Sequence, residues 1–187
     1  SPSCLILGDN IYHGNNLSSI LKEADEDREN STVFAYQVKD PERFGVLNLD
    51  RKGNPAKIAE KPKAPKSNLA ITGLYFFPKD VVSRAKNLNP SKRGELEITD
   101  LNQSYLTDKK LKVKILNRGF TWMDTRTFDS LLEASNFISL VQNRQNTIVA
   151  CPEEIAYRNK WINQSEVKKV AKLMQSAYGQ YLKSFIN

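Results

Sequence analysis

The nine residues LAITGLYFF, at positions 69–77, constrain the fold more than any other stretch of the chain. They are apolar almost throughout and partly β-branched, a composition typical of a central strand that is buried on both faces. A sheet containing such a strand needs other elements packed over each of its faces. We therefore expect an α/β fold with helices on both sides of the sheet.

Other segments supply the remaining elements of this fold. Strands are predicted within residues 3–9, 31–38, 44–50 and 110–116, and a Gly-Asn turn makes residues 44–60 a predicted hairpin. Apolar residues at helical spacing predict helices within residues 15–29, 78–88, 128–145, 151–162 and 165–185. Asparagines are expected to cap the first helix, Pro78 to lie in the first turn of the second, and the apolar stripes to be core. Residues 1–126 are thus the predicted α/β core, and residues 127–187 a helical region of the same domain.

Composition removes several classes of function. The chain has 187 residues, 40% of them hydrophobic, which is enough for one sizeable core. No apolar run is long enough to span a bilayer and no signal peptide is visible, so a cytoplasmic location is expected and a membrane partner is not. Two cysteines and one histidine argue against a zinc site or a Ser-His-Asp triad.

The net charge of +7 leaves two classes of anionic partner, nucleic acids and small phosphates. The lysines are dispersed, as in EKPKAPK and LTDKKLKVK, and do not interleave with aromatic residues as they do in nucleic-acid modules. A small phosphorylated ligand is therefore favoured.

Two aspartates stand where apolar segments end. Asp9 follows the run LIL in LILGDN, and Asp124 follows an aromatic strand end in GFTWMDTRT. Each has an ordinary structural explanation, because Gly-Asp-Asn is common turn chemistry and Asp-Thr can cap a helix. Taken alone, each motif favours that structural explanation, and the alternative is that each aspartate offers a carboxylate to a metal ion.

Three further stretches carry polar or unusual residues. Glu60 and Lys61 end a strand before a proline, either as solvated charges or as ligand contacts. Gly73 interrupts the central strand, where it permits either a bulge or close approach of another group. The acids of KRGELEITD either begin a helix, where negative charge is favourable, or belong to a site.

These motifs occur in the order LILGDN, EKP, TGLYFF, RGELEITD, WMDT and CPEEIAY, and together they resemble the bacterial glucose-1-phosphate thymidylyltransferases. That family catalyses the first step of dTDP-rhamnose synthesis, and the resemblance runs from about Leu5 to Tyr157. It implies a Rossmann-like nucleotidyltransferase sheet, here incomplete, with helices on both faces and a helical C-terminal appendage. It also implies glucose 1-phosphate and dTTP as substrates, Mg²⁺ as cofactor and a homo-oligomer.

The resemblance assigns roles to individual residues. Asp9 and Asp124 correspond to the two metal-binding carboxylates, and hard oxygen ligands suit Mg²⁺. Lys61 corresponds to the catalytic lysine that pairs with the sugar phosphate as a point charge. The positions that match sugar-phosphate contacts are Gly45, Glu60, Lys61, Gly73, Tyr75, Arg93, Glu95 and Trp122. A second, regulatory nucleotide site is matched by Gly14, Asn15, Ser18, Ser19, Arg118, Glu154, Ile155 and Arg158.

The chain departs from the family pattern at two places. The glycine-rich loop G-G-x-G-T-R-L, whose amides and arginine hold the triphosphate, is missing from the sequence, and so are the base-reading residues that follow it. Arg126 also replaces a family glycine beside Asp124, where it either strains the backbone or reaches a phosphate. We expect a truncated thymidylyltransferase that is inactive alone. The alternative is a non-catalytic paralogue that binds sugar phosphate or assembles with other subunits.

Overall fold

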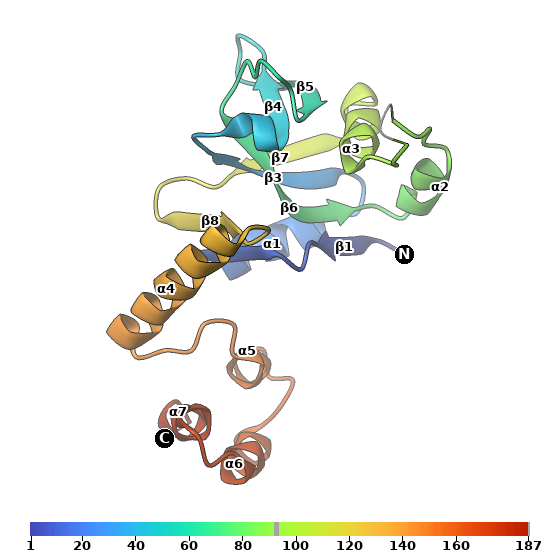
Figure 1. The fold of residues 1–187 in the computed structure, drawn as a ribbon. Helices are drawn as coiled ribbons and strands as arrows, with labels where there is room; N and C mark the ends of the chain where they lie inside the picture. The colour runs from blue at the N-terminus through green and yellow to red at the C-terminus, as the bar shows by residue number, and fades with distance from the viewer. Residues whose placement is uncertain (92–93, 187) are drawn as a thin grey trace. The chain divides into compact units, whose positions relative to one another are not determined.

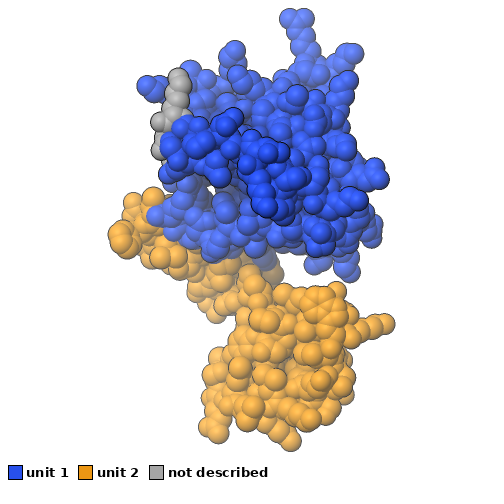
Figure 2. Space-filling model, turned by 90° about the vertical axis from the view of Figure 1, so that its right-hand side faces the viewer, with its two compact units in different colours: residues 1–126 blue, residues 127–187 orange. Residues whose placement is uncertain are grey.

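The structure is a computed structural model that describes residues 1–91 and 94–186 (Figure 1). The chain divides into two compact units, residues 1–126 and residues 127–187, which Figure 2 distinguishes by colour. The first is a mixed α/β unit and the second is helical, and each is described by itself.

The first unit is built on β6 (Leu69–Phe77), the strand that the sequence singled out. Its first residues pair with β4 (Gly45–Leu49) and its last residues pair along the same edge with β1 (Ser3–Ile6). Its other edge pairs with β3 (Ser31–Gln37), which in turn pairs in parallel with β7 (Leu111–Ile115). β5 (Pro55–Glu60) completes the predicted hairpin with β4. The expected α/β sheet is confirmed.

Helices cover both faces of this sheet, as β3 illustrates. Val33 and Ala35 belong to the core that also contains Tyr105 of α3 (Ile98–Thr107). Phe34, which points to the opposite face, belongs to the core that contains Ala24 of α1 (Leu17–Glu26). Successive side chains of a strand alternate between faces, so two separate cores form on the two sides of one sheet.

A second, two-stranded sheet supplies one side of the site described below. It joins β2 (Asn10–Gly14) to β8 (Phe120–Asp124) in antiparallel register, and Asn10 lies opposite Asp124. Sequence analysis recognised β8 only as an aromatic strand end and missed β2, because neither segment alternates clearly.

Two predicted helix starts are wrong in detail. Asn16 precedes α1 in a left-handed conformation, and its side chain makes no capping hydrogen bond. Pro78 lies before the first turn of α2 (Val81–Lys86) and not within it, because Asp80 is the residue that directly precedes this helix. The short 3₁₀ helix η1 (Pro41–Arg43) was not predicted. Such boundaries depend on local turns that apolar spacing does not encode.

The second unit contains α4 (Phe128–Gln145), α5 (Pro152–Arg158), α6 (Gln164–Leu173) and α7 (Ala177–Ser184). The single helix expected over residues 165–185 is two helices, because the chain is extended at Met174 and the two helices pack against each other through Val167 and Leu182. α4 buries Ala134 and Val141 but exposes most of its other apolar residues, so the expected core stripe is wrong there. Helical spacing predicts an apolar face but not a neighbour to cover it.

Among the residues that the structure describes, no helix is long and apolar enough to cross a membrane.

Candidate active site

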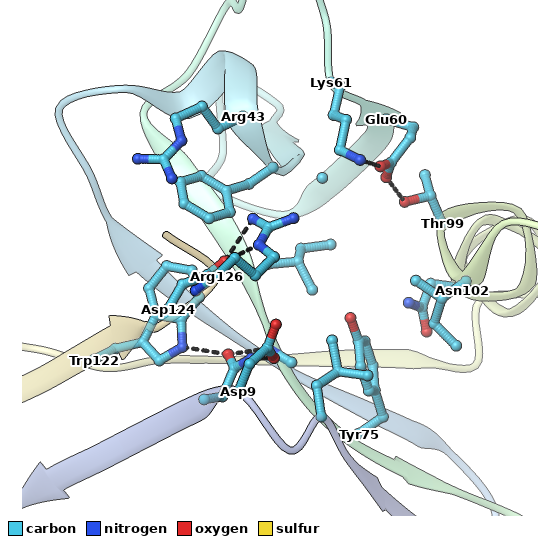
Figure 3. A pocket seen from close by; sticks show the side chains of 17 residues that line it. Asp9, Arg43, Glu60, Lys61, Tyr75, Thr99, Asn102, Trp122, Asp124 and Arg126 are labelled. Carbon is cyan, nitrogen blue, oxygen red and sulfur yellow. Dashed lines mark hydrogen bonds and ion pairs between the residues drawn. The ribbon is translucent and has the colours of Figure 1, made fainter. Parts of the chain in front are cut away.

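A cavity of about 160 Å³ lies in the first unit, between the open end of the β2–β8 ladder, β6 and α3 (Figure 3). Eight of the predicted site residues line it, although they come from segments spread over more than a hundred positions. They are Asp9, Gly45, Glu60, Lys61, Gly73, Tyr75, Trp122 and Asp124. The fold thus brings together side chains that the sequence related only through motif order.

The two aspartates meet at one corner of the cavity. Asp9 lies in the turn between β1 and β2, and Asp124 is the last residue of β8. The backbone carbonyl of Asp9 accepts hydrogen bonds from the Thr125 amide at 2.8 Å and from the Thr125 hydroxyl at 3.0 Å. This clamp fixes the Asp9 turn beside the end of β8, and both side chains face the cavity (Figure 3).

Asn10 organises the same corner. Its Nδ2 donates to Asp9 Oδ1 at 2.7 Å, while its Oδ1 accepts from Trp122 Nε1 at 2.6 Å and from the Gly73 amide at 3.2 Å. One side chain therefore joins an aspartate, the aromatic wall and the central strand. Asn10 was not among the predicted site residues, although it completes the GDN motif.

The aromatic wall consists of Trp122 and Phe44. Trp122 is 8% exposed and meets Phe44 edge to face, with the ring centroids 5.1 Å apart. Tyr36 meets the same indole edge to face at 6.1 Å. Two aromatic contacts and the hydrogen bond that its indole N–H donates to Asn10 Oδ1 hold Trp122 in place as a wall of the cavity.

Glu60 and Lys61 occupy the opposite side of the cavity. Glu60 Oε2 accepts from the Thr99 hydroxyl at 2.6 Å, and its Oε1 lies 3.6 Å from Lys61 Nζ. Lys61 is left-handed, with φ +40°, which costs a non-glycine residue about 1–2 kcal/mol. Strain of this kind is found preferentially at functional sites, where the surroundings hold it in place.

At two positions of the cavity wall, neighbouring side chains come so close to the backbone that a glycine is needed. A Cβ atom on Gly45 would lie 3.1 Å from Thr99 Oγ1, and one on Gly73 would lie 2.8 Å from both Leu7 Cδ1 and Asn10 Nδ2. The pairing of β6 with β3 also shifts register beside Gly73, so this residue combines the two roles that the sequence left open.

Neutral polar groups line the floor. Burial raises the pKa of Tyr75, so its hydroxyl stays protonated and can donate. Asn102, on α3, is 1% exposed, and its side-chain carbonyl has no hydrogen-bond partner among the described residues. A buried, unpaired carbonyl at a cavity wall is suited to accept a hydrogen bond from a ligand hydroxyl.

Some predicted residues are not brought to this cavity. Arg93 lies outside the described residues, and Glu95 is exposed in the loop before α3 and is absent from the described lining. In the predicted regulatory set, Gly14 packs against the Phe120 ring, and Arg158 pairs with Glu154 at 2.5 Å. Five of that set lie in the first unit and three in the second, so the regulatory site stays a prediction.

Several lining residues were not predicted. Thr99 and Asn102 sit one turn apart in the ITDLN stretch of α3, and this i, i+3 spacing of polar residues could have revealed them. Arg43 and Phe44 offered no such signal, because η1 and the adjacent turn were not recognised.

Arg126, the departure noted in the sequence, also lines the cavity. Its Nε and Nη2 lie 2.6 Å and 2.5 Å from Asp124 Oδ2, and its backbone amide donates to Oδ1 at 3.0 Å. The hydrogen bond to Asp124 raises the pKa of this guanidinium, although partial burial opposes the shift. Arg126 does not have a left-handed backbone, so strain from a positive φ, one of the alternatives that the sequence left open, is absent.

The acidic corner fits a divalent cation with an incomplete set of protein ligands. The described residues contain no cluster of three or more potential ligands, so Asp9 and Asp124 stand as a pair of carboxylates. Mg²⁺ is commonly held by one or two carboxylates together with water and substrate phosphates. A corner that offers two carboxylates matches that pattern.

Comparison with known proteins agrees with this geometry. Residues 1–140 match the family model described as nucleotidyl transferase. The chain is 54% identical over 180 residues to a glucose-1-phosphate thymidylyltransferase of Neisseria gonorrhoeae and 50% identical over 182 residues to one of Xanthomonas campestris pv. campestris. These alignments cover 96% and 97% of the chain, which spans 62% of the length of each of these relatives.

Solved structures extend the comparison to the fold. A structure described as a glucose-1-phosphate thymidylyltransferase from Bacillus anthracis in complex with sucrose is 40% identical, with a TM-score of 0.64 over 73% of this chain and 54% of that one. A UDP-glucose pyrophosphorylase structure at 24% identity has a TM-score of 0.62 over 72% of this chain and 55% of its own, and supports the fold alone. By sequence and by fold, the chain belongs to the nucleotidyl transferase family.

Proposed function

We propose that this chain is the sugar-phosphate-binding part of a glucose-1-phosphate thymidylyltransferase. The observation that carries this proposal is the convergence of Asp9, Glu60, Lys61 and Asp124 on one cavity from three distant segments. The names of the relatives, of which the chain spans 62%, supply the particular reaction. In that reaction a phosphate oxygen of glucose 1-phosphate attacks the α-phosphorus of dTTP, and pyrophosphate leaves.

The two sides of the cavity divide the work in this proposal. Glu60 accepts hydrogen bonds from sugar hydroxyls, and the Thr99 hydroxyl fixes the carboxylate for that purpose. Tyr75 and Asn102 line the sugar side with a donor and an acceptor. Lys61 pairs with the sugar phosphate and orients its attacking oxygen.

The acidic corner holds the metal in the same scheme. Asp9 and Asp124 are the residues that would bind Mg²⁺, with Asn10 orienting Asp9 through its 2.7 Å hydrogen bond. When bound, the cation neutralises phosphate charge. Positioning and charge neutralisation supply most of the catalysis available for transfer at phosphorus.

Calorimetric titration with glucose 1-phosphate tests the sugar site. Lys61→Ala should weaken binding by about 1.5–3 kcal/mol, the scale of a hydrogen bond to a charged group. Lys63→Ala is the matched control, since Lys63 is an exposed lysine two positions away that does not line the cavity. Equal affinities for the two variants would remove Lys61 from the site.

Turnover tests the remaining part of the proposal. We expect this chain alone to release no pyrophosphate from dTTP and glucose 1-phosphate with Mg²⁺, because the glycine-rich triphosphate loop is not in its sequence. Adding that segment upstream should restore activity. Turnover near ~1 s⁻¹ by the chain itself would contradict this expectation.

A second candidate function is a non-catalytic sugar-phosphate-binding or assembly subunit. The ion pair between Arg126 and Asp124 favours it, because it engages a carboxylate that catalysis needs. Failure of the extended chain to turn over, with sugar-phosphate binding retained, would support this candidate. We expect a cytoplasmic protein and a homo-oligomer in either case, and sedimentation measures the oligomeric state.

A further inference from the structure

We propose that Arg126 is a positioning residue that competes with the divalent cation for Asp124, so that coordination of the cation by Oδ2 requires the guanidinium to leave the carboxylate. This inference rests on the proposed function, in which Asp124 binds the cation. It concerns a residue to which that function gives no role.

The geometry of the ion pair leaves little room for a second cation on Asp124. Nε and Nη2 of Arg126 both contact Oδ2, and the Arg126 amide donates to Oδ1. A carboxylate oxygen offers two lone-pair positions, so both positions on Oδ2 and one on Oδ1 are engaged. A metal ion coordinated by Oδ2 must therefore displace the side chain of Arg126.

Exposure shows which partner covers the other. The Asp124 side chain is 8% exposed, whereas that of Arg126 is 42% exposed. The arginine is therefore the outer member of the pair, and the carboxylate beneath it is already largely removed from water. The Arg126 guanidinium and Asp9 lie at the same corner of the cavity. The positive charge of the guanidinium would therefore also repel a divalent ion bound there.

The chain contains a matched arginine that lacks this contact. The Arg43 guanidinium lies 5.5 Å from the centre of the Phe44 ring, and that of Arg126 lies 5.6 Å from the same centre (Figure 3). Both line the cavity, but Arg43 pairs with Asp40 at 2.7 Å. The two arginines thus carry the same charge, contact the same ring and line the same cavity. They differ in the carboxylate with which each forms an ion pair.

A competing partner reduces the apparent affinity to the fraction of molecules in which the site is free. If Arg126 holds Asp124 in about nine molecules of ten, the apparent dissociation constant for the cation rises about tenfold. Once displaced, the guanidinium remains beside the cavity with Lys61, where planar donors suit phosphate oxygens.

Binding of Mn²⁺ to the full chain, followed by the electron paramagnetic resonance signal of the free ion, tests the inference without any need for turnover. Arg126→Gly should bind Mn²⁺ about tenfold more tightly than the wild type, equivalent to about 1.4 kcal/mol. Arg126→Lys, which keeps the charge but loses the two-point contact, should fall between them. Arg43→Gly should change the affinity less than about threefold, and Asp124→Asn should abolish the site in every background.

Equal gains for Arg126→Gly and Arg43→Gly would overturn the inference, because removal of any nearby positive charge would then explain the effect. Unchanged affinity in both Arg126 variants would overturn it as well. If no variant binds Mn²⁺ more tightly than Asp124→Asn, Asp124 does not bind the metal, and the proposed competition is refuted as well. Parallel titration with glucose 1-phosphate then shows whether the sugar-phosphate site of the proposed function survives.

Discussion

Replacing Asn10 by alanine should destabilise the first unit, because this side chain joins three parts of the site. The substitution removes the donor to Asp9 at 2.7 Å and the acceptor of both the Trp122 indole at 2.6 Å and the Gly73 amide at 3.2 Å. A hydrogen bond to a charged group contributes about 1.5–3 kcal/mol and a neutral one about 1 kcal/mol.

These contributions do not simply add. Asp9 is only partly buried and adjacent in sequence to Asn10, so water replaces much of that contact. Trp122 is 8% exposed, so its indole N–H is left without a partner inside the protein. We therefore expect Asn10→Ala to lower the free energy of unfolding by about 2–4 kcal/mol, a large fraction of the stability of a typical domain.

Urea denaturation followed by tryptophan fluorescence measures this loss. Trp122 reports on the first unit and Trp161 on the second, so a Trp161→Phe background isolates the signal of interest. Asn54→Ala is the control, because Asn54 is an exposed residue whose side chain bonds only to Asp50 among the described contacts. A loss below about 0.5 kcal/mol for Asn10→Ala would refute this account of the corner, since ordinary surface substitutions cost no more.

Three further predictions follow from local geometry. Lys61→Gly should be more stable to urea than Lys61→Ala by about 1 kcal/mol, because glycine adopts the left-handed conformation without strain; equal stabilities would contradict this. Burial would raise the pKa of Asp27, but hydrogen bonds from Lys112 and the Asn30 amide outweigh it and lower the pKa to about 2, so stability present above pH ~4 should be lost as the pH falls toward 2. Asp27→Asn should remove about 1 kcal/mol at pH 7, after allowance for solvent screening, and flatten acid unfolding between pH 4 and 2; an unchanged acid profile would argue against it. Gly179→Ala should destabilise the second unit by about 3 kcal/mol, because its Cβ would lie 1.9 Å from a backbone oxygen. Trp161 fluorescence measures this loss, and Gly8→Ala, followed through Trp122 in the first unit, is an unobstructed control.

The sequence by itself determined the class of fold and pointed to residues that line the cavity. A nine-residue apolar strand cannot remain in water, so β6 had to be central. The resemblance to the thymidylyltransferases grouped Asp9, Glu60, Lys61 and Asp124 as a set, and all four line the cavity. Local composition is informative here because these residues either form the core or end the strands that do.

Tertiary structure alone decided how those residues meet. The β2–β8 ladder, the contacts of Asn10 and the unpaired carbonyl of Asn102 depend on segments that are about 60–110 positions apart, and no local pattern encodes which of them will touch. Arg126 is the sharpest case. Its identity was visible in the sequence, but the sequence did not show whether it strained the backbone, reached outward or held Asp124. The structure shows that it pairs with Asp124, where the end of β8 lies beside the Asp9 turn. Side-chain contacts of this kind depend on which surfaces folding places together.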